Sequence, residues 1–250
     1  MTAKNYSKSR YARFVALPSI GQEKMDKIRA TRATIVGTGG LGSVTTMQLT
    51  ALGVRFLRII DNDVVERTNL QRQMLFREED IGKPKVEVAK KFLEKLNPDV
   101  KIEGVQAEIK QKNASLVTDS VDLVIDALDK FTPRFIINRE CLKKKIPYLF
   151  GAVSGEIGNA MTVIPEKGAC IECVFGHVED KKLPSTSQTG IHPAVINVIG
   201  SIQITEATKI MIGKKPQLIN KLQFCDLTNL HFEVITIKPR EDCFCAKNRD

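Results

Sequence analysis

Tryptophan is absent from the 250-residue sequence, and tyrosine occurs only three times. Proteins that bind single-stranded nucleic acids stack the bases on aromatic side chains, so this scarcity argues against nucleic acid as a partner. The sequence is nevertheless basic, with 38 Lys and Arg against 29 Asp and Glu and a formal net charge of +9. We interpret this charge as a generally basic surface that suits nucleotides or acidic protein partners.

Long apolar runs are also missing. The longest apolar stretch, residues 193–204, is interrupted by Asn197, Gly200 and Gln203, and so falls short of the roughly 18 apolar residues of a membrane span. Residues 1–14 are basic and polar, without the apolar segment of a secretory signal. The hydrophobic share of 42% excludes a disordered chain. These features predict a folded, soluble, cytoplasmic protein with no membrane partner.

Cysteine is infrequent, but four of the six cysteines form two close pairs. Cys170 and Cys173 have C-x-x-C spacing, and Cys243 and Cys245 have C-x-C spacing. Thiols stay reduced in the cytoplasm, so the two pairs predict a tetrahedral Zn²⁺ site rather than disulfides. The C-x-C pair is a tighter chelate than usual and leaves the zinc geometry open. We expect the remaining cysteines, at 141 and 225, to be buried.

Residues 31–150 alternate between β-rich apolar runs and segments with helical spacing. Runs at 33–36 and 54–60 flank a helical segment at 41–52, which is the order of a βαβ unit. Further segments of the same two kinds follow: a helix at 83–96, a strand at 121–125, a helix after Pro133 and a strand around 148–150. The alternation predicts a Rossmann-like, doubly wound α/β sheet, preceded by an arm of helices at 1–30.

The pattern changes in residues 151–250. Alternating runs at 159–164 and 223–238 predict antiparallel strands that extend the sheet, with a helix at 194–212 between them. A polar segment at 176–192, flanked by His177 and His192, predicts a mobile loop, and we interpret both histidines as ordinary loop residues. With no Pro- or Ser-rich linker and no repeat, residues 1–250 are predicted to form a single domain.

A glycine-rich loop provides the first functional motif. It has the pattern G-x-G-x-x-G, follows a predicted strand and opens a predicted helix, and its glycines are Gly37, Gly39, Gly40 and Gly42. Such glycines let backbone N–H groups approach phosphates. Asp61 ends the next strand, 19 residues after Gly42, and can accept hydrogen bonds from a ribose. The motif by itself is compatible with NAD, FAD or ATP.

Charged residues downstream of this loop favour adenylyl transfer over hydride transfer. Arg72, Lys85 and a magnesium ion would neutralise the charge of departing pyrophosphate. Lys85 lies in the first turn of its predicted helix, where a cation is unfavourable unless an anion is nearby. Asp129 follows a parallel strand and is a natural Mg²⁺ ligand, whereas Asp126 is placed to cap the following turn.

The motif set resembles the MoeB/ThiF/HesA family of ubiquitin-activating-enzyme-like adenylyltransferases over nearly the whole chain. The matching motifs are R-Y-A-R from Arg10, G-x-G-G-L-G from Gly37, D-x-D-x-V-x-x-x-N-L-x-R-Q from Asp61, G-x-P-K from Gly82, D-x-x-D from Asp126 with Arg134, C-x-x-C from Cys170, and V-I-G-S-I-Q from Val198 with Glu206. The resemblance implies a ThiF-type domain that uses ATP and Mg²⁺ to adenylate the C-terminal Gly-Gly carboxylate of a ubiquitin-like sulfur carrier, as in molybdopterin, thiamine or tRNA thiolation pathways, with release of pyrophosphate.

The resemblance also assigns site residues. The implied ATP-binding set is Gly37, Gly39, Gly40, Gly42, Asp61, Asp63, Asn69, Arg72, Gln73, Lys85 and Asp129, with Asp129 as the Mg²⁺ ligand. Arg13 resembles an arginine that reaches across a homodimer into the partner's site, and Arg134 is a candidate for the same task. Arg13, Arg72, Lys85 and Asp129 would thus be catalytic. The four paired cysteines resemble the family's structural zinc ligands, and the loop at 176–192 would cross over the tail of the carrier.

Two departures from the family pattern stand out. Thr186 occupies the loop position where many relatives carry a cysteine, and a threonine cannot form a thioester. We therefore expect a stand-alone adenylyltransferase whose sulfur comes from another protein, unless Cys141 or Cys225 is exposed. Lys130 stands where relatives commonly have Asn after the magnesium aspartate.

Three alternative functions remain open at this point. A tRNA-borne or small carboxylate could be adenylated, as in threonylcarbamoyladenosine dehydratases, although the zinc cysteines argue against this. An NAD(P)-dependent oxidoreductase would need a substrate domain that the sequence lacks. A non-catalytic partner of a ubiquitin-like protein would have no use for the intact ATP cluster.

Overall fold

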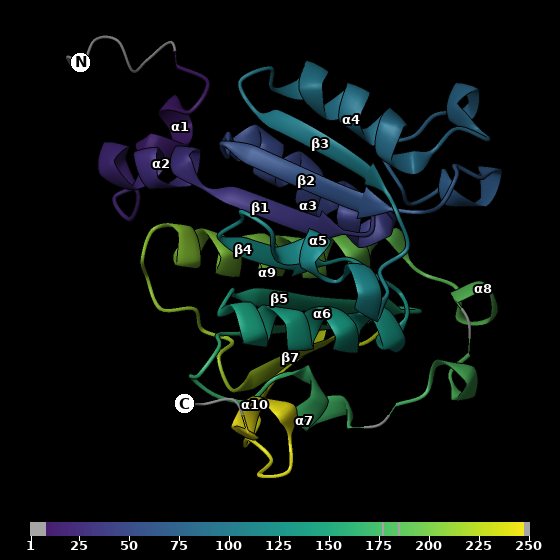
Figure 1. Ribbon diagram of the computed structural model, residues 1–250. Helices are drawn as coiled ribbons and strands as arrows, with labels where there is room; N and C mark the ends of the chain where they lie inside the picture. The colour runs from purple at the N-terminus through teal and green to yellow at the C-terminus, as the bar shows by residue number, and fades with distance from the viewer. Residues whose placement is uncertain (1–8, 177, 185, 248–250) are drawn as a thin grey trace.

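A single mixed sheet organises the protein in a computed structural model, which describes residues 9–176, 178–184 and 186–247. The eight strands have the order β3-β2-β1-β4-β5-β6-β7-β8 (Figure 1). Their bounds are β1 Arg32–Val36, β2 Phe56–Asp61, β3 Lys101–Gln106, β4 Leu123–Asp126, β5 Tyr148–Ser154, β6 Ile157–Val163, β7 Lys221–Asp226 and β8 His231–Thr236. Strands β1 to β5 pair in parallel, and β5 to β8 pair in antiparallel fashion. The predicted Rossmann-like sheet with an antiparallel extension is confirmed.

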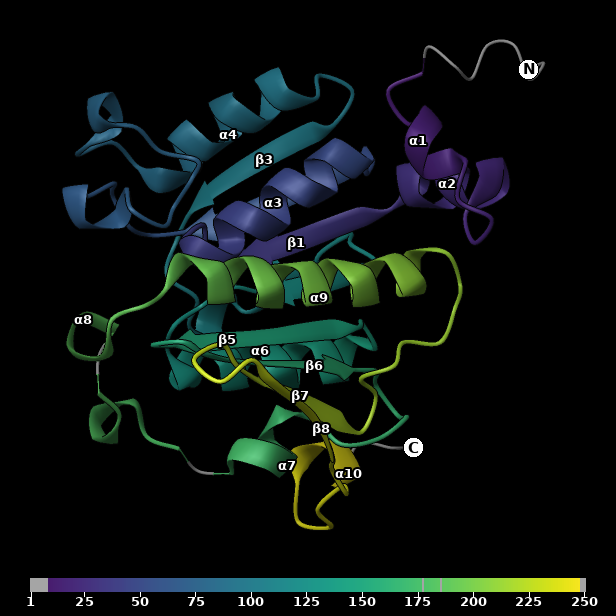
Figure 2. The ribbon, with the colours of Figure 1, turned by 180° about the vertical axis from the view of Figure 1, so that it is seen from behind.

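Helices cover both faces of this sheet. The helices are α1 Ala12–Val15, α2 Gly21–Ala30, α3 Gly40–Leu52, α4 Lys85–Leu96, α5 Ser115–Thr118, α6 Phe131–Lys144, α7 Ile171–Phe175, α8 Thr186–Thr189, α9 Pro193–Met211 and α10 Phe244–Lys247. Helices α5 and α6 lie on the face seen in Figure 1, and α3 and α9 lie on the face seen in Figure 2. Within the described residues, no helix is long and apolar enough to cross a membrane.

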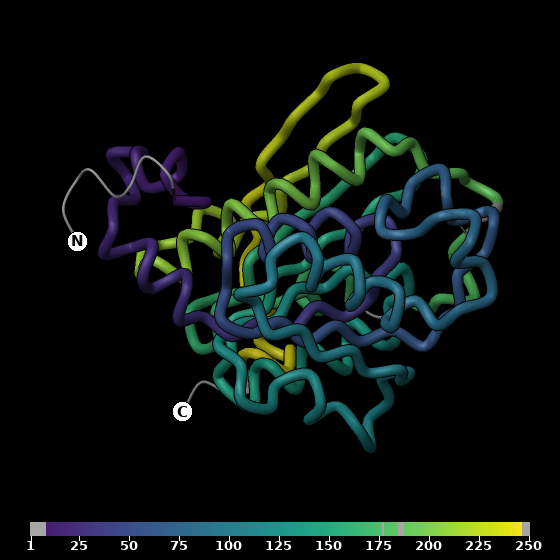
Figure 3. Tube along the Cα trace, turned by 90° about the horizontal axis from the view of Figure 1, so that it is seen from above, coloured from purple at the N-terminus to yellow at the C-terminus, as the bar shows by residue number. Residues whose placement is uncertain are grey.

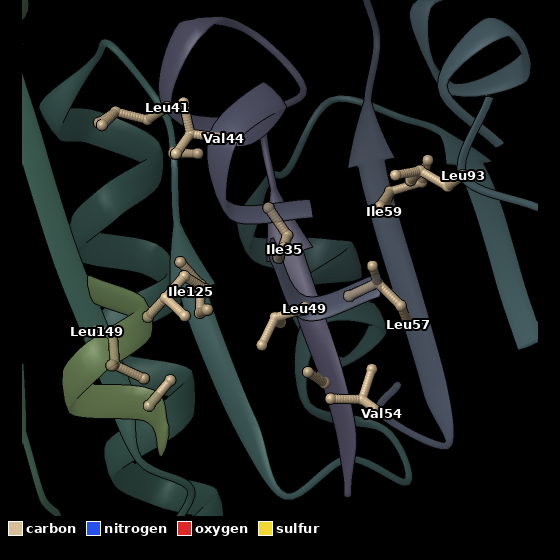
Figure 4. Packing of buried hydrophobic residues seen from close by; sticks show 14 of the residues in the cluster. Ile35, Leu41, Val44, Leu49, Val54, Leu57, Ile59, Leu93, Ile125 and Leu149 are labelled. Atoms are coloured by element: carbon tan, nitrogen blue, oxygen red, sulfur yellow. The ribbon is translucent and has the colours of Figure 1, made fainter. Parts of the chain in front are cut away.

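Alternating strand residues feed two hydrophobic cores. Ile35 of β1 packs in the core beneath α3 and α9, whereas Val36 packs in the core beneath α6. The first core is seen in Figure 4, where Leu49 of α3 lies near the strand residues Ile35 and Leu57. Because successive side chains of a strand point to opposite faces, a strand buried on both faces has a continuous apolar sequence. This explains why β1, β2 and β4 are recognisable as apolar runs.

Some elements differ from the prediction. Helix α6 begins at Phe131, two residues before Pro133, because proline is tolerated in the first turn, where its missing N–H has no intrahelical partner. Strand β3 was not predicted. The run at 223–238 is a hairpin of β7 and β8 that projects from the body (Figure 3). All the residues of β8 are exposed.

The topology creates one special edge. Strand β1 continues through α3 to β2 on one side, while β4 lies on its other side. Ligands of doubly wound sheets bind at this switch point, outside the carboxyl ends of the strands. The segments after β1, β2, β3 and β4 all meet there.

Candidate active site

A cavity of about 450 Å³ opens at the carboxyl ends of β1, β2 and β4. Nine of the predicted site residues line it: Gly37, Gly39, Gly40, Asp61, Asp63, Arg72, Gln73, Lys85 and Asp129. The segment after β3 contributes residues 107–111. The segment at 178–184 and 186–192, here called the crossing segment, contributes Asp180 and Ile191. Gly42, Asn69 and Arg13 do not line the cavity.

The glycine-rich loop forms one wall through close backbone contacts. A Cβ atom on Gly42 would lie 2.0 Å from the Gly37 carbonyl oxygen, and Gly37 itself has a φ of +95°. Gly42 is therefore needed for the tight turn into α3, although it does not line the cavity. Helix α3 has no side-chain cap at its N-terminus. Its first N–H groups are therefore available to an anion in the cavity.

Asp61 connects this loop to the end of β2. Its Oδ2 accepts hydrogen bonds from the Thr38 backbone N–H at 2.7 Å and from the Thr38 hydroxyl at 2.8 Å. Its Oδ1 accepts one from the Asp63 N–H at 2.9 Å. Thr38 was not among the predicted residues, although a hydroxyl in the loop that faces a strand-terminal carboxylate is a usable signal. The carboxylate retains acceptor capacity toward a ribose in the cavity.

Lys85 has the nearby anion that its position at the start of a helix requires. Its Nζ lies 2.9 Å from Oδ2 of Asp63, and its side chain is 6% exposed against 58% for Asp63. The Lys85 N–H also donates to the Asp63 carbonyl oxygen at 3.0 Å. The ammonium group is thus buried in the cavity wall with one exposed partner, which leaves it available to a phosphate. Lys83 is a surface residue paired with Asp80.

Arg72 and Gln73 follow the 3₁₀ turn η2 Arg67–Asn69. Arg72 Nη1 donates to the Thr68 carbonyl oxygen at 2.9 Å, which positions the guanidinium at the cavity. Gln73 is 4% exposed, and its Oε1 has no partner within the described part of the chain. Asn69 serves the turn itself, since its Oδ1 accepts from the Glu66 N–H at 3.1 Å.

The D-x-x-D pair divides into a buried and an exposed carboxylate. Asp126 is fully buried and its Oδ1 accepts from the Leu128 N–H at 2.9 Å, which confirms it as a turn cap. Burial raises the pKa of Asp126, although the Arg134 charge opposes the rise. Asp129 is exposed on the cavity wall. An exposed carboxylate in this place is the type of donor that Mg²⁺ prefers.

Arg134 does not face the cavity, so its candidate role at the phosphates is wrong. It is 2% exposed, and its Nε lies 3.2 Å from Oδ2 of Asp126. Its Nη2 donates to the carbonyl oxygens of Leu128 and Gly151. The guanidinium is thus held by the Asp126 carboxylate and by carbonyl oxygens of the turn after β4 and of β5, and it does not line the cavity.

Helix α1, which contains Arg13, lies at the end of the sheet where β1 begins, away from the carboxyl ends of the strands that line the cavity (Figure 1). The helix is anchored through Tyr11, whose hydroxyl accepts from Asn97 Nδ2 at 3.0 Å and whose ring packs on Gly53. The Arg13 side chain is exposed. Any contact between Arg13 and an active site therefore requires a second chain.

The crossing segment contains the remaining candidates. Asp180, in the 3₁₀ turn η5 Asp180–Lys182, accepts from the N–H groups of Phe131 and Thr132 at 2.6 and 3.0 Å. His192 caps α9, because its Nδ1 accepts from the Ala194 N–H at 3.0 Å. Thr186 begins α8. His177 lies outside the described residues.

The four paired cysteines come together. All four Sγ atoms lie within 4.8 Å of one another, near the roughly 3.8 Å that follows from tetrahedral Zn–S bonds of about 2.3 Å. Burial raises the pKa of Cys243 to about 12. The set is able to hold a metal ion, and its chemistry fits zinc. The expected burial of Cys141 and Cys225 is confirmed.

Comparisons with known proteins agree with this geometry. The model of the ThiF family matches residues 11–245. The chain is 36% identical to a SAMP-activating enzyme E1 of Haloferax volcanii, covering 94% of this chain and 87% of the relative. It is 32% identical to a sulfur carrier protein adenylyltransferase of Thermus thermophilus, covering 94% and 89%.

Among solved structures, E. coli MccB with ATP is similar, with a TM-score of 0.84, 25% identity, and coverage of 97% of this chain and 75% of that chain. The family model covers nearly all the described residues, including the glycine-rich loop, the cavity and all four paired cysteines. The chain belongs to the ThiF family.

Proposed function

We propose that this protein is an ATP-dependent adenylyltransferase that activates the C-terminal Gly-Gly carboxylate of a ubiquitin-like sulfur carrier. The observation that carries the proposal is the convergence of Lys85, Arg72 and the uncapped N-terminus of α3 on one cavity. These positive groups match a triphosphate. The names of the relatives, which include an E1 enzyme and a sulfur carrier adenylyltransferase, support the choice of substrate.

The chemistry needs positioning rather than a base. A carrier carboxylate is ionised at neutral pH and attacks the α-phosphorus directly. A new C(O)–O–P bond forms, and the bond from the α-phosphorus to the bridging oxygen breaks with its electron pair leaving on pyrophosphate. Lys85 and Arg72 would hold the phosphates, Thr38 and Asp61 would fix the loop, and Asp129 would hold Mg²⁺. Bound Mg²⁺ supplies charge neutralisation on the phosphates.

An exposed apolar ribbon on β8 and the residue before it suits the body of the carrier. Leu230, Phe232 and Val234 are exposed. The hairpin that carries them is joined to the turn after β5, because the Leu227 N–H donates to the Glu156 carbonyl oxygen at 3.0 Å. Since β5 ends at the same edge as β1, the ribbon begins on the cavity side. A carrier bound there could direct its tail into the cavity, where a Gly-Gly end is thin enough to pass the crossing segment.

Two further parts of the proposal concern assembly and metal. A homodimer would let the exposed Arg13 of one chain reach the cavity of the other, where a cation stabilises departing phosphates. Zn²⁺ held by the four paired cysteines would connect α7 to α10 and play no chemical part. A cytoplasmic location is part of the same proposal, because thiols stay reduced in the cytoplasm and are then able to bind zinc.

ATP–pyrophosphate exchange tests the proposed function. Exchange should appear with Mg²⁺ and a carrier ending in Gly-Gly, and should disappear when the last glycine of the carrier is removed. Arg72→Ala should abolish it, while Arg67→Ala, which removes an exposed arginine paired with Glu78, should leave it unchanged. ATP binding without exchange for any carrier would point to a small or tRNA-borne carboxylate. Failure to bind ATP would overturn the proposal.

A further inference from the structure

We propose that Arg134 is a positioning residue that fixes the direction of Asp129 by holding the Leu128 peptide. The inference rests on the proposed function only in taking Asp129 as a metal-binding carboxylate. It assigns a role to a buried arginine that cannot itself touch the nucleotide.

Asp129 has no side-chain support of its own. Within the described residues, no hydrogen bond or ion pair holds its carboxylate, which is exposed on the cavity wall. The direction of that carboxylate therefore depends on the backbone that carries it. A displacement of 1 Å at such a position is enough to change a metal or phosphate contact.

The preceding residue, Leu128, is held on both of its backbone groups. Its N–H donates to Asp126 Oδ1 at 2.9 Å, and its carbonyl oxygen accepts from Arg134 Nη2. Asp126 and Arg134 face each other at 3.2 Å. The two backbone groups of Leu128 are thus each bonded to one member of a buried ion pair, and the carbonyl held by Arg134 belongs to the Leu128–Asp129 peptide.

The ion pair of Asp126 and Arg134 is hydrogen-bonded to other elements around the sheet. Tyr148 of β5 donates to Asp126 Oδ2 at 2.5 Å, and Arg134 Nη2 donates to the Gly151 carbonyl oxygen at 2.8 Å. Gln203 of α9 donates to the carbonyl oxygens of Asp126 at 2.8 Å and Leu149 at 3.1 Å. Three elements, β5, α6 and α9, therefore converge on the turn after β4.

The energetics favour a role in positioning. A buried ion pair gains little stability over a well-packed apolar pair, because both charges lose their hydration. Its hydrogen bonds, however, allow only one geometry for the groups that they engage. Here those groups include the peptide from which the site carboxylate projects. Partners outside the ligand shell commonly change metal affinity about tenfold or more when they are altered.

The test measures metal binding directly, on the full-length protein. Mn²⁺ is titrated in the presence of α,β-methylene ATP and its binding is followed by electron paramagnetic resonance. Arg134→Lys keeps the charge but cannot hold Asp126 and the Leu128 carbonyl together, and should weaken Mn²⁺ binding about tenfold. Arg58→Lys is the matched control, because Arg58 is also buried, pairs with Glu103 at 2.7 Å and donates to two backbone carbonyls. It should leave Mn²⁺ binding unchanged.

A second comparison separates positioning from a general loss of structure. In an Asp129→Asn background, Arg134→Lys should have almost no further effect on Mn²⁺ binding, since the group that it directs is gone. The inference would be overturned if Arg134→Lys and Asp129→Asn weakened Mn²⁺ binding independently, so that their effects multiplied. It would also be overturned if Arg58→Lys weakened Mn²⁺ binding equally, or if the unaltered protein bound no Mn²⁺. Should Arg134→Lys fail to fold, Tyr148→Phe takes its place with the same expectations and a smaller effect. An error in the proposed function is recognised separately. In that case carrier-dependent exchange is absent from the unaltered protein, while Mn²⁺ binding still differs between the variants as described.

Discussion

Lys85 and Asp63 form the most informative side-chain pair at the cavity. An ammonium group that is 6% exposed needs a partner, and Asp63 supplies one from a position that is itself 58% exposed. Desolvating both groups completely would cost several kcal/mol. The exposed half of the pair lessens that cost and leaves Asp63 able to turn away when a phosphate takes its place beside Lys85.

Replacing Lys85 by alanine should abolish activity with little loss of stability. We expect Lys85→Ala to lower the rate of carrier-dependent pyrophosphate exchange by about a hundredfold or more, since a donor to developing charge is lost. Lys83→Ala removes a surface lysine two residues away and serves as the control, with exchange close to that of the unaltered protein. Similar rates for the two variants would show that Lys85 does not act on the phosphates.

Lys85, Arg134 and Thr38 differ in how well their contacts could be predicted from the sequence. The need of Lys85 for a nearby anion was predictable from its place in the first helical turn, and Asp63 meets that need. The burial of Arg134 was not predictable, because its distance from Asp126 along the chain does not show whether a guanidinium turns toward the cavity or the sheet. Thr38 was missed because its role depends on a carboxylate that is distant in sequence.

At the scale of elements, burial on both faces decided what could be predicted. The central strands are continuous apolar runs and were found, as were helices α3, α4 and α9. Strand β3 lies at the edge of the sheet and alternates exposed with less exposed residues. Its sequence, with Glu103 and Gly104 in the middle, resembles a loop, and only its pairing with β2 makes it a strand. Strand β8 is also at an edge of the sheet, but its alternating sequence within the run at 223–238 made it predictable.

Helix α6 receives its N-terminal cap from a distant element. Asp180 of the crossing segment accepts from the Thr132 hydroxyl at 2.6 Å as well as from the first backbone N–H groups of α6. Burial acts to raise the pKa of Asp180, but hydrogen bonds from Thr132 and Phe131 and the Lys130 charge outweigh it and lower the pKa. The ionised carboxylate is therefore stabilised in the folded protein.

Removing this cap should loosen the crossing segment. Asp180→Ala should lower the free energy of unfolding by about 1 kcal/mol in urea titrations and speed proteolysis at 178–184. Glu179→Ala, which removes an exposed pair with Lys182, should do neither. Because the folded pKa is the lower one, the contribution is present above the ordinary aspartate pKa of about 3.9 and disappears as the pH falls through the folded value. A variant whose stability deficit stayed constant through that acid range would contradict this assignment.

At the scale of the whole molecule, the cysteine cluster brings together two segments that are far apart in the sequence. Cys170 and Cys243 approach to 3.5 Å although they are separated by 73 residues. Spacing alone indicated that the two pairs would meet, because neither pair provides four ligands by itself. The position of Arg13 is the opposite case, since one chain cannot show where an exposed arginine binds in an assembly.

Zinc should be present in the purified protein at one ion per chain and should be lost on acidification. Protons compete with zinc for thiols whose pKa is raised, as for Cys243 at about 12. The affinity for zinc therefore decreases as the pH is lowered. Cys243→Ser should lower both the zinc content and the melting temperature. Cys141→Ala, outside the cluster, should keep the zinc content unchanged. A zinc-free protein with an unchanged melting temperature would contradict a structural metal.

The central claim is that the carrier carboxylate itself receives AMP. The most direct measurement is mass spectrometry of a Gly-Gly carrier after incubation with the protein, ATP, Mg²⁺ and pyrophosphatase. Our account predicts a carrier that gains one adenylyl group at its C-terminus, with no such gain for Lys85→Ala or for a carrier lacking its last glycine. An unmodified carrier under conditions in which the protein binds both ATP and the carrier would contradict it.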